Sequence, residues 1–378
     1  MKPKAAITKC SGYEAGEVYA AVSEAVNLLG GIRAFAGPGE RILIKPNLLA
    51  SRTADKAVTT HPAVVAALIR LVADSGARPF VGDSPAIGSA KKVAEKSGIL
   101  DACRDAGAEL IELKELVVVE NPGGHRFKRL EVSKEALSFD GIINAPKLKT
   151  HAQMHLTLGV KNLFGCVPGR LKPQWHLSAG VDSADFADML LDLCFYLKPR
   201  LTVMDGIVAM EGNGPSSGTP RPLGLVFASH DAVAMDAVAA NVLGAKRDDL
   251  PILKAATRRG MAGAEIGAVD VLGCPVESVK VHGFKFPPFM SVNFAAGLPY
   301  FIDKRLRSAL TSRPAINNNG CTLCSVCVNV CPPGVMTRSS RIEIDYDRCI
   351  RCYCCQEVCP EGAIAPVEGW IKRLIPGL

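Results

Sequence analysis

The sequence predicts an α/β protein: a large domain with a mainly parallel sheet and flanking helices, followed by a small α+β domain. Three observations support this prediction. In residues 1–285, short apolar segments alternate with segments of helical periodicity, which is typical of parallel sheets. Nine of the fourteen cysteines lie between Cys321 and Cys359. The 378 residues are also enough for two domains.

The predicted elements of the large domain follow one another along the chain. Strand segments are short, apolar and bounded by turn residues, whereas helix segments repeat apolar residues every three or four positions. Pro46 ends the first predicted strand, and Pro62 begins the second helix. Strands are expected at 41–45, 78–83, 109–113, 141–144, 200–204, 223–227 and 269–272, helices at 18–29, 62–74, 91–106, 232–243 and 250–259, and a last segment at 278–281.

Four segments divide the chain. We expect the α/β domain over residues 1–285, a linker over 286–316, the small domain over 317–366 and a tail over 367–378. The linker holds four prolines and five aromatic residues, which favours a docked segment over a free tether. The tail is expected to pack on its own domain, with contact to a membrane surface or a partner as the alternative.

Charge and hydropathy narrow the classes of partner. Lysine and arginine number 44 against 37 acidic residues, a net charge of +7 without a basic run of the nucleic-acid-binding kind. This favours anionic small molecules or acidic proteins and argues against nucleic acid. No apolar stretch reaches the ~18 residues that a membrane span needs, and the first residues do not resemble a secretory signal. We therefore expect a cytoplasmic protein without a transmembrane segment.

The clustered cysteines have a regular spacing. Each of two runs reads Cys-x2-Cys-x2-Cys-x3-Cys-Pro, which is typical of two [4Fe–4S] sites in which the fourth cysteine of each run serves the other cluster. The predicted ligands are Cys321, Cys324, Cys327 and Cys359 for cluster 1, and Cys349, Cys352, Cys355 and Cys331 for cluster 2. Two zinc sites are the alternative, but zinc would use two pairs of cysteines.

Residues 317–366 thus resemble bacterial ferredoxins, which implies single-electron transfer and a redox partner protein. Residues 341–345, between the two runs, alternate like a short strand and suit a hairpin. Cys354 lies outside the ligand pattern and is expected to be a spare thiol.

Polar clusters follow several predicted strands of the large domain. They lie at 45–47, 83–85, 146–151 and 205–215. Open parallel sheets place their ligand sites at the carboxyl ends of the strands, so these clusters predict one cleft.

The same clusters carry a family resemblance. The motifs, in order, are Lys-Pro-Asn-Leu-Leu at 45–49, Thr-His-Pro at 60–62, Asp-Ser-Pro at 83–85, Lys-Leu-Lys-Thr-His at 147–151, Lys-Asn-Leu-Phe-Gly at 161–165, Pro-Gly to His at 168–176, and Asp-Gly-Ile to Glu-Gly-Asn-Gly-Pro at 205–215. Together they resemble the domain of unknown function 362 family, in its form fused to a two-cluster ferredoxin domain. The resemblance implies little about the reaction.

Residue types indicate the chemistry of the predicted cleft. Its lysines, with Arg170 and Lys172, would attract a carboxylate or phosphate, although lysines at loop starts are usually solvated. Histidine titrates near neutral pH and suits proton delivery during a reduction. The candidate substrate-binding residues are Lys45, Asn47, Asp83, Lys147, Lys161, Asn162, Asp205 and Glu211, and the candidate catalytic residues are His151, His176 and Lys149.

Two further features leave alternatives open. Three histidines, with four acidic residues, could bind a divalent metal, since imidazole and carboxylate suit Zn, Fe, Mn or Ni. This set is His151, His155 and His176 with Asp83, Asp205, Glu211 and Asp236. The glycine-rich segment 211–218 could hold phosphate or close a tight loop, but it lacks the dinucleotide and Walker motifs.

Three functional hypotheses remain. The leading one is an iron–sulfur oxidoreductase that reduces an anionic substrate or cofactor in the basic cleft. The second is a non-catalytic electron-transfer subunit whose large domain docks to a partner enzyme. The third is a redox-neutral enzyme with structural or sensory clusters.

Overall fold

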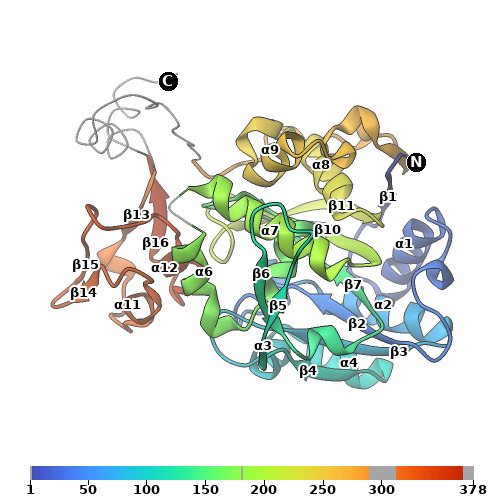
Figure 1. The fold of residues 1–378 in the computed structure, drawn as a ribbon, viewed down its shortest axis with the longest axis horizontal. Helices are drawn as coiled ribbons and strands as arrows, with labels where there is room; N and C mark the ends of the chain where they lie inside the picture. The colour runs from blue at the N-terminus through green and yellow to red at the C-terminus, as the bar shows by residue number, and fades with distance from the viewer. Residues whose placement is uncertain (1, 180–181, 289–311, 369–378) are drawn as a thin grey trace.

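The computed structural model describes residues 2–179, 182–288 and 312–368 and shows a large α/β domain with a small domain at one side (Figure 1). The large domain is built on a ten-stranded sheet whose main path is β12-β1-β11-β10-β7-β2-β3-β4, with β8 beside β10 and β9 beside β8. The strands are β1 (Lys4–Lys9), β2 (Arg41–Pro46), β3 (Arg78–Asp83), β4 (Glu109–Glu112), β7 (Gly141–Ala145), β8 (Lys147–His151), β9 (His155–Thr157), β10 (Leu201–Glu211), β11 (Thr219–Ser229) and β12 (Asp270–Gly273).

Strand direction confirms the mainly parallel sheet predicted from the sequence. Every neighbouring pair from β4 to β10 is parallel, and so are the pairs β8–β10 and β1–β12. The strand β11 runs antiparallel to both β10 and β1, and β9 runs antiparallel to β8. The carboxyl ends of β2, β3 and β7 therefore lie along one edge of the sheet.

Helices cover both faces of this sheet (Figure 1). Successive strand residues point to opposite faces, so Ile42 and Ile44 enter one apolar core while Leu43 enters the other. Four helices cover the first core: α1 (Ala15–Asn27), α2 (Pro62–Asp74), α3 (Ala90–Ser97) and α4 (Ile99–Ala106). Three helices cover the second: α7 (Ser183–Leu197), α8 (Ala232–Val242) and α9 (Pro251–Arg258).

The helices differ from the prediction in places, and two of the differences have local reasons. The single helix expected at 91–106 is two helices, because Gly98 has a φ of 79° and ends α3 where α4 begins. The helix α7 is absent from the predicted set, since Asp188 and Asp192 interrupt its apolar pattern. Both aspartates are nevertheless buried. The last segment expected, at 278–281, falls partly in a short 3₁₀ turn, Val276–Val279.

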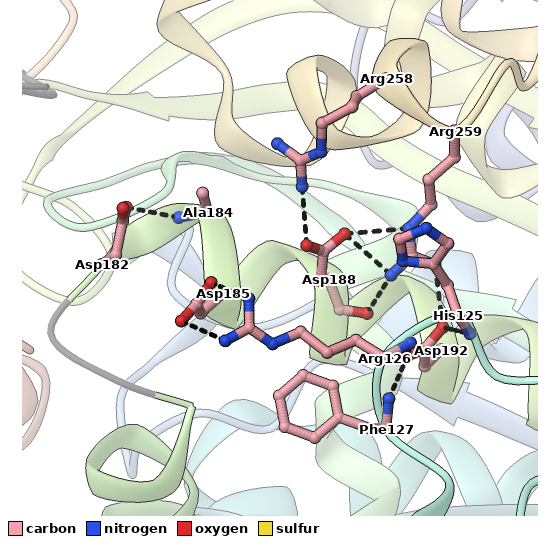
Figure 2. Close-up of polar contacts among 10 residues, drawn as sticks. All are labelled: His125, Arg126, Phe127, Asp182, Ala184, Asp185, Asp188, Asp192, Arg258 and Arg259. Atoms are coloured by element: carbon pink, nitrogen blue, oxygen red, sulfur yellow. Dashed lines mark hydrogen bonds and ion pairs between the residues drawn. The ribbon is translucent and has the colours of Figure 1, made fainter. Parts of the chain in front are cut away.

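The aspartates of α7 bind arginines and a hairpin turn, as Figure 2 shows. Arg259 donates to Asp188 Oδ1 at 2.9 Å and to Asp192 Oδ1 at 2.9 Å. Asp192 also accepts three backbone N–H groups, from residues 125 to 127, at 2.8 to 2.9 Å. These residues form the turn between β5 (Leu116–Glu120) and β6 (Arg129–Ser133).

That turn supports a second helix. The ring of Phe127 packs against Trp175 with centroids 5.8 Å apart. Trp175 belongs to α6 (Lys172–Ser178), which also carries His176. The charged network of α7 therefore fixes the position of α6, the helix that faces the small domain (Figure 1).

The small domain consists of two similar halves. Its elements are β13 (Arg313–Ile316), α11 (Val326–Val330), β14 (Met336–Arg338), β15 (Ile342–Ile344), α12 (Cys354–Val358) and β16 (Ile364–Val367). The pairs β13–β16 and β14–β15 are antiparallel, and β15 falls on the strand expected at 341–345. A small apolar core that includes Met336, Ile342 and Ile364 joins the halves.

Parts of two sequence predictions lie outside the described residues. Residues 289–311 hold most of the linker predicted at 286–316, and residues 369–378 hold most of the predicted tail. The predicted domain boundaries accordingly stay predictions. In the part of the chain that the structure describes, no helix combines the length and apolar character needed to cross a bilayer.

Candidate functional site

A cavity lies where the small domain meets the sheet edge of the large domain. It has about 60 Å³ of space for the centres of water-sized molecules, enough for about four waters or a small ligand. Large-domain residues form its floor and walls, and residues of α11 and α12 form its roof. The polar lining residues are Lys45, Asn47, Asp83, Ser84, Lys149, His151, Thr157, Lys161, Asn162, Lys172, His176, Cys354 and Glu357.

Strand ends deliver many of these side chains, as the sequence predicted. Lys45 and Asp83 stand at the ends of the parallel strands β2 and β3. The segment 147–151, expected among the polar clusters that follow strands, is itself the strand β8, and all five of its residues are buried. It pairs with β10 and with β9, and its residues Lys149 and His151 line the cavity.

Lys45 and Asp83 form a buried ion pair. Lys45 Nζ lies 2.9 Å from Asp83 Oδ1 and donates to Pro46 O at 2.7 Å. The other carboxylate oxygen of Asp83 accepts the N–H of Leu48 at 2.7 Å. A Cβ on Gly165 would lie 1.9 Å from Asp83 Oδ1, so the pair needs glycine at that position.

Lys149 is held by neutral groups alone. Its Nζ donates to Asn47 Oδ1 at 2.9 Å and to Val58 O at 2.6 Å. Asn47 in turn donates to Asn162 Oδ1 at 2.9 Å, so both predicted asparagines belong to this network. Burial, and then the nearby charge of Lys161, lower the pKa of Lys149 well below its usual value.

Lys161 and Lys172 complete the basic lining. Lys161 is on α5 (Gly159–Asn162) and, within the described residues, makes no hydrogen bond or ion pair. Burial lowers its pKa. Lys172 donates to Ser84 O, and burial lowers its pKa to about 8 although Asp83 opposes the shift. The cavity thus has four lysines against two carboxylates, Asp83 and Glu357.

His151 connects the floor of the cavity to its roof. Its Nδ1 accepts the backbone N–H groups of Gln153 and Met154, both at 3.1 Å, so the ring proton is on Nε2. His151 Nε2 then donates to Glu357 Oε1 at 2.7 Å. Burial lowers the pKa of His151 to about 4. Burial would raise the pKa of Glu357, but Lys161 and His151 outweigh it and hold that pKa below its usual value.

His176 and Thr157 each bring an unpaired polar atom to the cavity. The His176 ring stacks on Phe186, with centroids 4.3 Å apart, and meets the edge of Phe164 at 5.9 Å. Burial lowers the pKa of His176 to about 3. His176 Nδ1 and Thr157 Oγ1 are buried and have no hydrogen-bond partner among the described residues.

The glycine-rich segment 211–218 contacts the small domain. Gln356 of α12 donates to Asn213 Oδ1 at 2.5 Å and to Gly214 O at 2.9 Å. A Cβ on Gly214 would lie 2.2 Å from Thr150 O, so the loop passes too close to β8 for a larger residue. Of the two expectations for this segment, these contacts favour tight loop closure beside the cavity.

Three predicted binding residues do not line the cavity. Lys147 and Asp205 form their own buried ion pair at 2.7 Å, and both contact the hydroxyl of Tyr13 at 2.8 Å. Glu211 pairs with Arg221 at 3.1 Å. The other eight residues predicted for substrate binding or catalysis all line the cavity.

The structure lends no support to a second metal site in the large domain. Within the described residues, no three His, Cys, Asp or Glu side chains lie close enough to hold a single ion. Three of the predicted acidic ligands already form ion pairs: Asp83 with Lys45, Asp205 with Lys147, and Glu211 with Arg221. Asp236 instead accepts the backbone N–H groups of Gly159 and Val160 at 2.7 and 3.2 Å.

The predicted ligands of cluster 1 surround one cavity of the small domain. Cys321, Cys324 and Cys327 line it together with Cys359 from the other cysteine run. For the second set, burial raises the pKa of Cys355, and the thiols of Cys352, Cys349 and Cys331, with Cys327 of the first set, add to the rise. The crossed ligand assignment therefore stays a prediction, and the lining of this cavity is consistent with its first set.

The backbone of the two cysteine runs is also suited to clusters. Positive φ angles occur at Leu323 and Ser325 and, 28 positions further on, at Arg351 and Tyr353. The two runs therefore share the same local backbone turns. The N–H groups of residues 335 and 363 donate to Cys331 Sγ and Cys359 Sγ at 3.5 and 3.3 Å, a type of contact that supports thiolate ligands. The donor set therefore fits two [4Fe–4S] clusters.

Two roof residues escaped the sequence reasoning. Cys354 was expected to be a spare thiol, yet it is buried and lines the basic cavity. Glu357 carried no signal, because its partner His151 is 206 positions away in the sequence. The sequence does place both residues between the predicted ligands Cys352 and Cys359, on the five-residue helix α12, and so close to the predicted clusters.

Comparison with known proteins agrees with this architecture. The fold and the site define an α/β protein joined to a 4Fe-4S dicluster domain, whose family model matches residues 320–363. A family model described as domain of unknown function (DUF362) matches residues 42–241, and the chain belongs to this family. The small domain accordingly binds [4Fe–4S] clusters, and the name of its model is consistent with two.

Known proteins similar to this chain include a cyanobacterial relative and a distant structural neighbour. A thylakoid-associated protein of Synechocystis sp. is 40% identical over 306 residues, which cover 79% of this chain and 92% of that protein. The lactate racemase apoprotein from Thermoanaerobacterium thermosaccharolyticum has a TM-score of 0.40 and 13% identity, over 61% of this chain and 55% of its own. The second likeness is too distant to inform the site.

Proposed function

We propose that this protein is an iron–sulfur reductase that holds a small anionic substrate in the cavity between its two domains. The observation that carries this proposal is the composition of the cavity. Its floor is basic and comes from the large domain, whereas its roof includes α12, which begins at Cys354 and contains the predicted cluster ligand Cys355. A substrate bound there lies against the helix that holds the electron-transfer group.

The lysines supply binding energy for an anion. Lys149 and Lys161 have no carboxylate partner among the described residues, and both are buried. A buried charge without a counter-ion is unfavourable, so an anionic ligand would relieve that cost. Asn47 and Asn162 hold the lysine framework in place and, as cavity residues, can orient the ligand.

Eight cysteines would hold the clusters, in the two sets given above. A [4Fe–4S] cluster supplies single electrons at a potential set by its surroundings. The positive charges of the buried lysines would stabilise the negative charge that a bound substrate carries or gains on reduction. The redox partner would be a separate protein.

Lys172 is better suited to deliver a proton than the two predicted histidines. The low pKa values of His151 and His176 keep both rings neutral near pH 7. Lys172 has a pKa of about 8, so it is mostly protonated at neutral pH and can still release its proton. We therefore assign the general-acid role to Lys172. His151 instead has the role of a hydrogen-bond donor to Glu357.

We also propose a cytoplasmic location. None of the fourteen cysteines forms a disulfide bond, which is usual in a reducing compartment. The related cyanobacterial protein is named for its association with thylakoids, and that name describes the relative alone. Cell fractionation with an antibody to this chain tests the proposal, and recovery in the membrane fraction at physiological salt would contradict it.

Reoxidation of the reduced protein tests the reductase proposal. The full chain is reduced anaerobically, freed of reductant and mixed with a panel of small carboxylates and phosphorylated metabolites while its visible absorbance is followed. We expect one class of anion to reoxidise the protein with formation of a reduced product. Lys149→Met should slow this reaction, whereas Lys254→Met, at an exposed position of α9, should not.

Two outcomes would favour the other hypotheses. If no anion reoxidises the protein, but a co-purifying enzyme does so stoichiometrically, the chain is an electron-transfer subunit. If an anion is converted without any change in absorbance, the chemistry is redox-neutral and the clusters are structural or sensory.

A further inference from the structure

Two buried polar atoms in the cavity lack partners, and they point to a ligand. Thr157 and His176 are each 3% exposed, and neither Thr157 Oγ1 nor His176 Nδ1 has a hydrogen-bond partner within the described part of the chain. Most buried polar atoms in native proteins are hydrogen-bonded, because an unpaired one loses its hydration without compensation. Since both residues line the same small cavity, one bound molecule can satisfy both atoms.

Lys161 adds a charge to these two atoms. It lies four positions after Thr157, the last residue of β9, and belongs to α5, and it lines the same cavity. Burial, with the positive charge of Lys161 as a further cause, lowers the pKa of His176, and both side chains line the cavity. Glu357, the nearest carboxylate of the roof, is already bound to His151 at 2.7 Å.

The chemistry of the three groups identifies the ligand class. A threonine hydroxyl can donate, a neutral imidazole has one N–H, and an ammonium has three donors. A cation would be repelled by Lys161, and a neutral ligand would leave its ammonium without an ion pair within the described residues. An oxyanion accepts from all three groups, and a cavity of about 60 Å³ limits it to a few heavy atoms.

We propose that Thr157, Lys161 and His176 form an oxyanion subsite that binds the carboxylate or phosphate group of the ligand. The subsite deepens the proposed function, and it rests on that function for the claim that the ligand is a substrate. The remainder of the cavity, beside Cys354 and Val358, is left for the group that reacts.

Calorimetry with two simple probes tests the subsite. The full chain, purified anaerobically with its clusters, is titrated with inorganic phosphate and with acetate. We expect stoichiometric binding of at least one probe, and the tighter of the two shows whether the site prefers a tetrahedral or a planar oxyanion. An affinity that is the same for chloride as for both probes would overturn the proposal.

Three variants and one control assign the binding to these residues. Lys161→Met should weaken it by about tenfold or more, since it removes a charged hydrogen bond. Thr157→Val and His176→Phe should each weaken it by about threefold to tenfold, and the phenyl ring keeps the stacking on Phe186. Lys254→Met should have no effect. Unchanged affinity in all three variants overturns the subsite. Thr157→Val is the smallest of the three changes, so it still tests the subsite if one of the larger changes prevents folding.

The subsite and the reductase function can fail separately. If the probes bind, the variants weaken binding and no anion reoxidises the reduced protein, the subsite stands and the reductase function is wrong. If reoxidation proceeds with the same KM in the three variants as in the wild type, the reductase function stands and the subsite is wrong.

Discussion

His151 Nε2 lies 2.7 Å from Glu357 Oε1, and this hydrogen bond joins the large domain to the small one across the cavity. The two residues are 206 positions apart, on β8 and α12. Both side chains are nearly inaccessible, at 1% and 10% exposure. The contact therefore fixes the roof that carries Cys354 over the floor that carries the lysines.

Removal of this contact should destabilise the attachment of the small domain. In His151→Leu, the buried carboxylate of Glu357 loses its donor, which costs about 1.5–3 kcal/mol. Anaerobic thermal unfolding and limited proteolysis between the domains measure the effect. His282→Leu, at an exposed site, is the matched control. Equal unfolding temperatures for the two variants would show that the contact does not hold the domains together.

Lys161→Met should make the ligand-free protein more stable while it weakens anion binding. Burial lowers the pKa of Lys161 although the charge of Glu357 opposes the shift, so the desolvation cost exceeds that attraction, and methionine fills a similar volume without the cost. We expect a gain of about 1 kcal/mol or more in the free energy of unfolding. Chemical denaturation in buffer free of phosphate and carboxylate measures it. A loss of stability would mean that the charge of Lys161 is compensated inside the protein.

Gly165→Ala should break the buried ion pair of Lys45 and Asp83. The new Cβ would lie 1.9 Å from Asp83 Oδ1 and 2.4 Å from Lys45 Nζ, so one side chain must move. Breaking a buried pair costs about 3–5 kcal/mol, and we expect a loss of unfolding free energy of that order. Gly123→Ala is the control, because nothing lies within 4 Å of a Cβ there. A loss below about 1 kcal/mol would show that the loop adapts at little cost.

The pH dependence of reoxidation should report Lys172. Its ammonium can give a proton only below its pKa of about 8, so the rate should fall as the pH rises through 8. The charged groups that set this value are Asp83 on β3, Lys45 on β2, Glu357 on α12 and Lys161 on α5.

Lys172→Arg keeps the charge but releases no proton near neutral pH. The rate should therefore fall about 100-fold at pH 7, and the decline through pH 8 should disappear. Stopped-flow absorbance over a series of buffers measures both profiles. An unchanged profile in the variant would assign the proton to another group.

Local sequence patterns were sufficient for much of the fold and the cavity floor. Strand–helix alternation predicted the parallel sheet, and the polar residues after β2 and β3 predicted the cavity edge. Lys147 and Lys149 look equivalent in the sequence, but the pairing of β8 with β10 shifts between Asp205 and Met210. Lys147 consequently meets Asp205, whereas Lys149 lines the cavity.

The roof could not be predicted in this way. Docking of α12 depends on contacts such as Gln356 with Asn213, between segments more than 100 positions apart. No local periodicity encodes such a contact. Helix α7 was missed for a related reason: Asp188 and Asp192 look like surface residues until Arg259 is brought beside them by the fold.

Electron paramagnetic resonance of the reduced protein, with and without inorganic phosphate, tests the central claim most directly. Analysis should first find about eight irons per chain, as two [4Fe–4S] clusters require. We predict that phosphate changes the spectrum of the wild-type protein but not that of Lys161→Met, because the anion sits beside the helix that contains Cys355. A spectrum that phosphate leaves unchanged, in protein shown by calorimetry to bind it, would contradict the claim that the cavity and the clusters form one site.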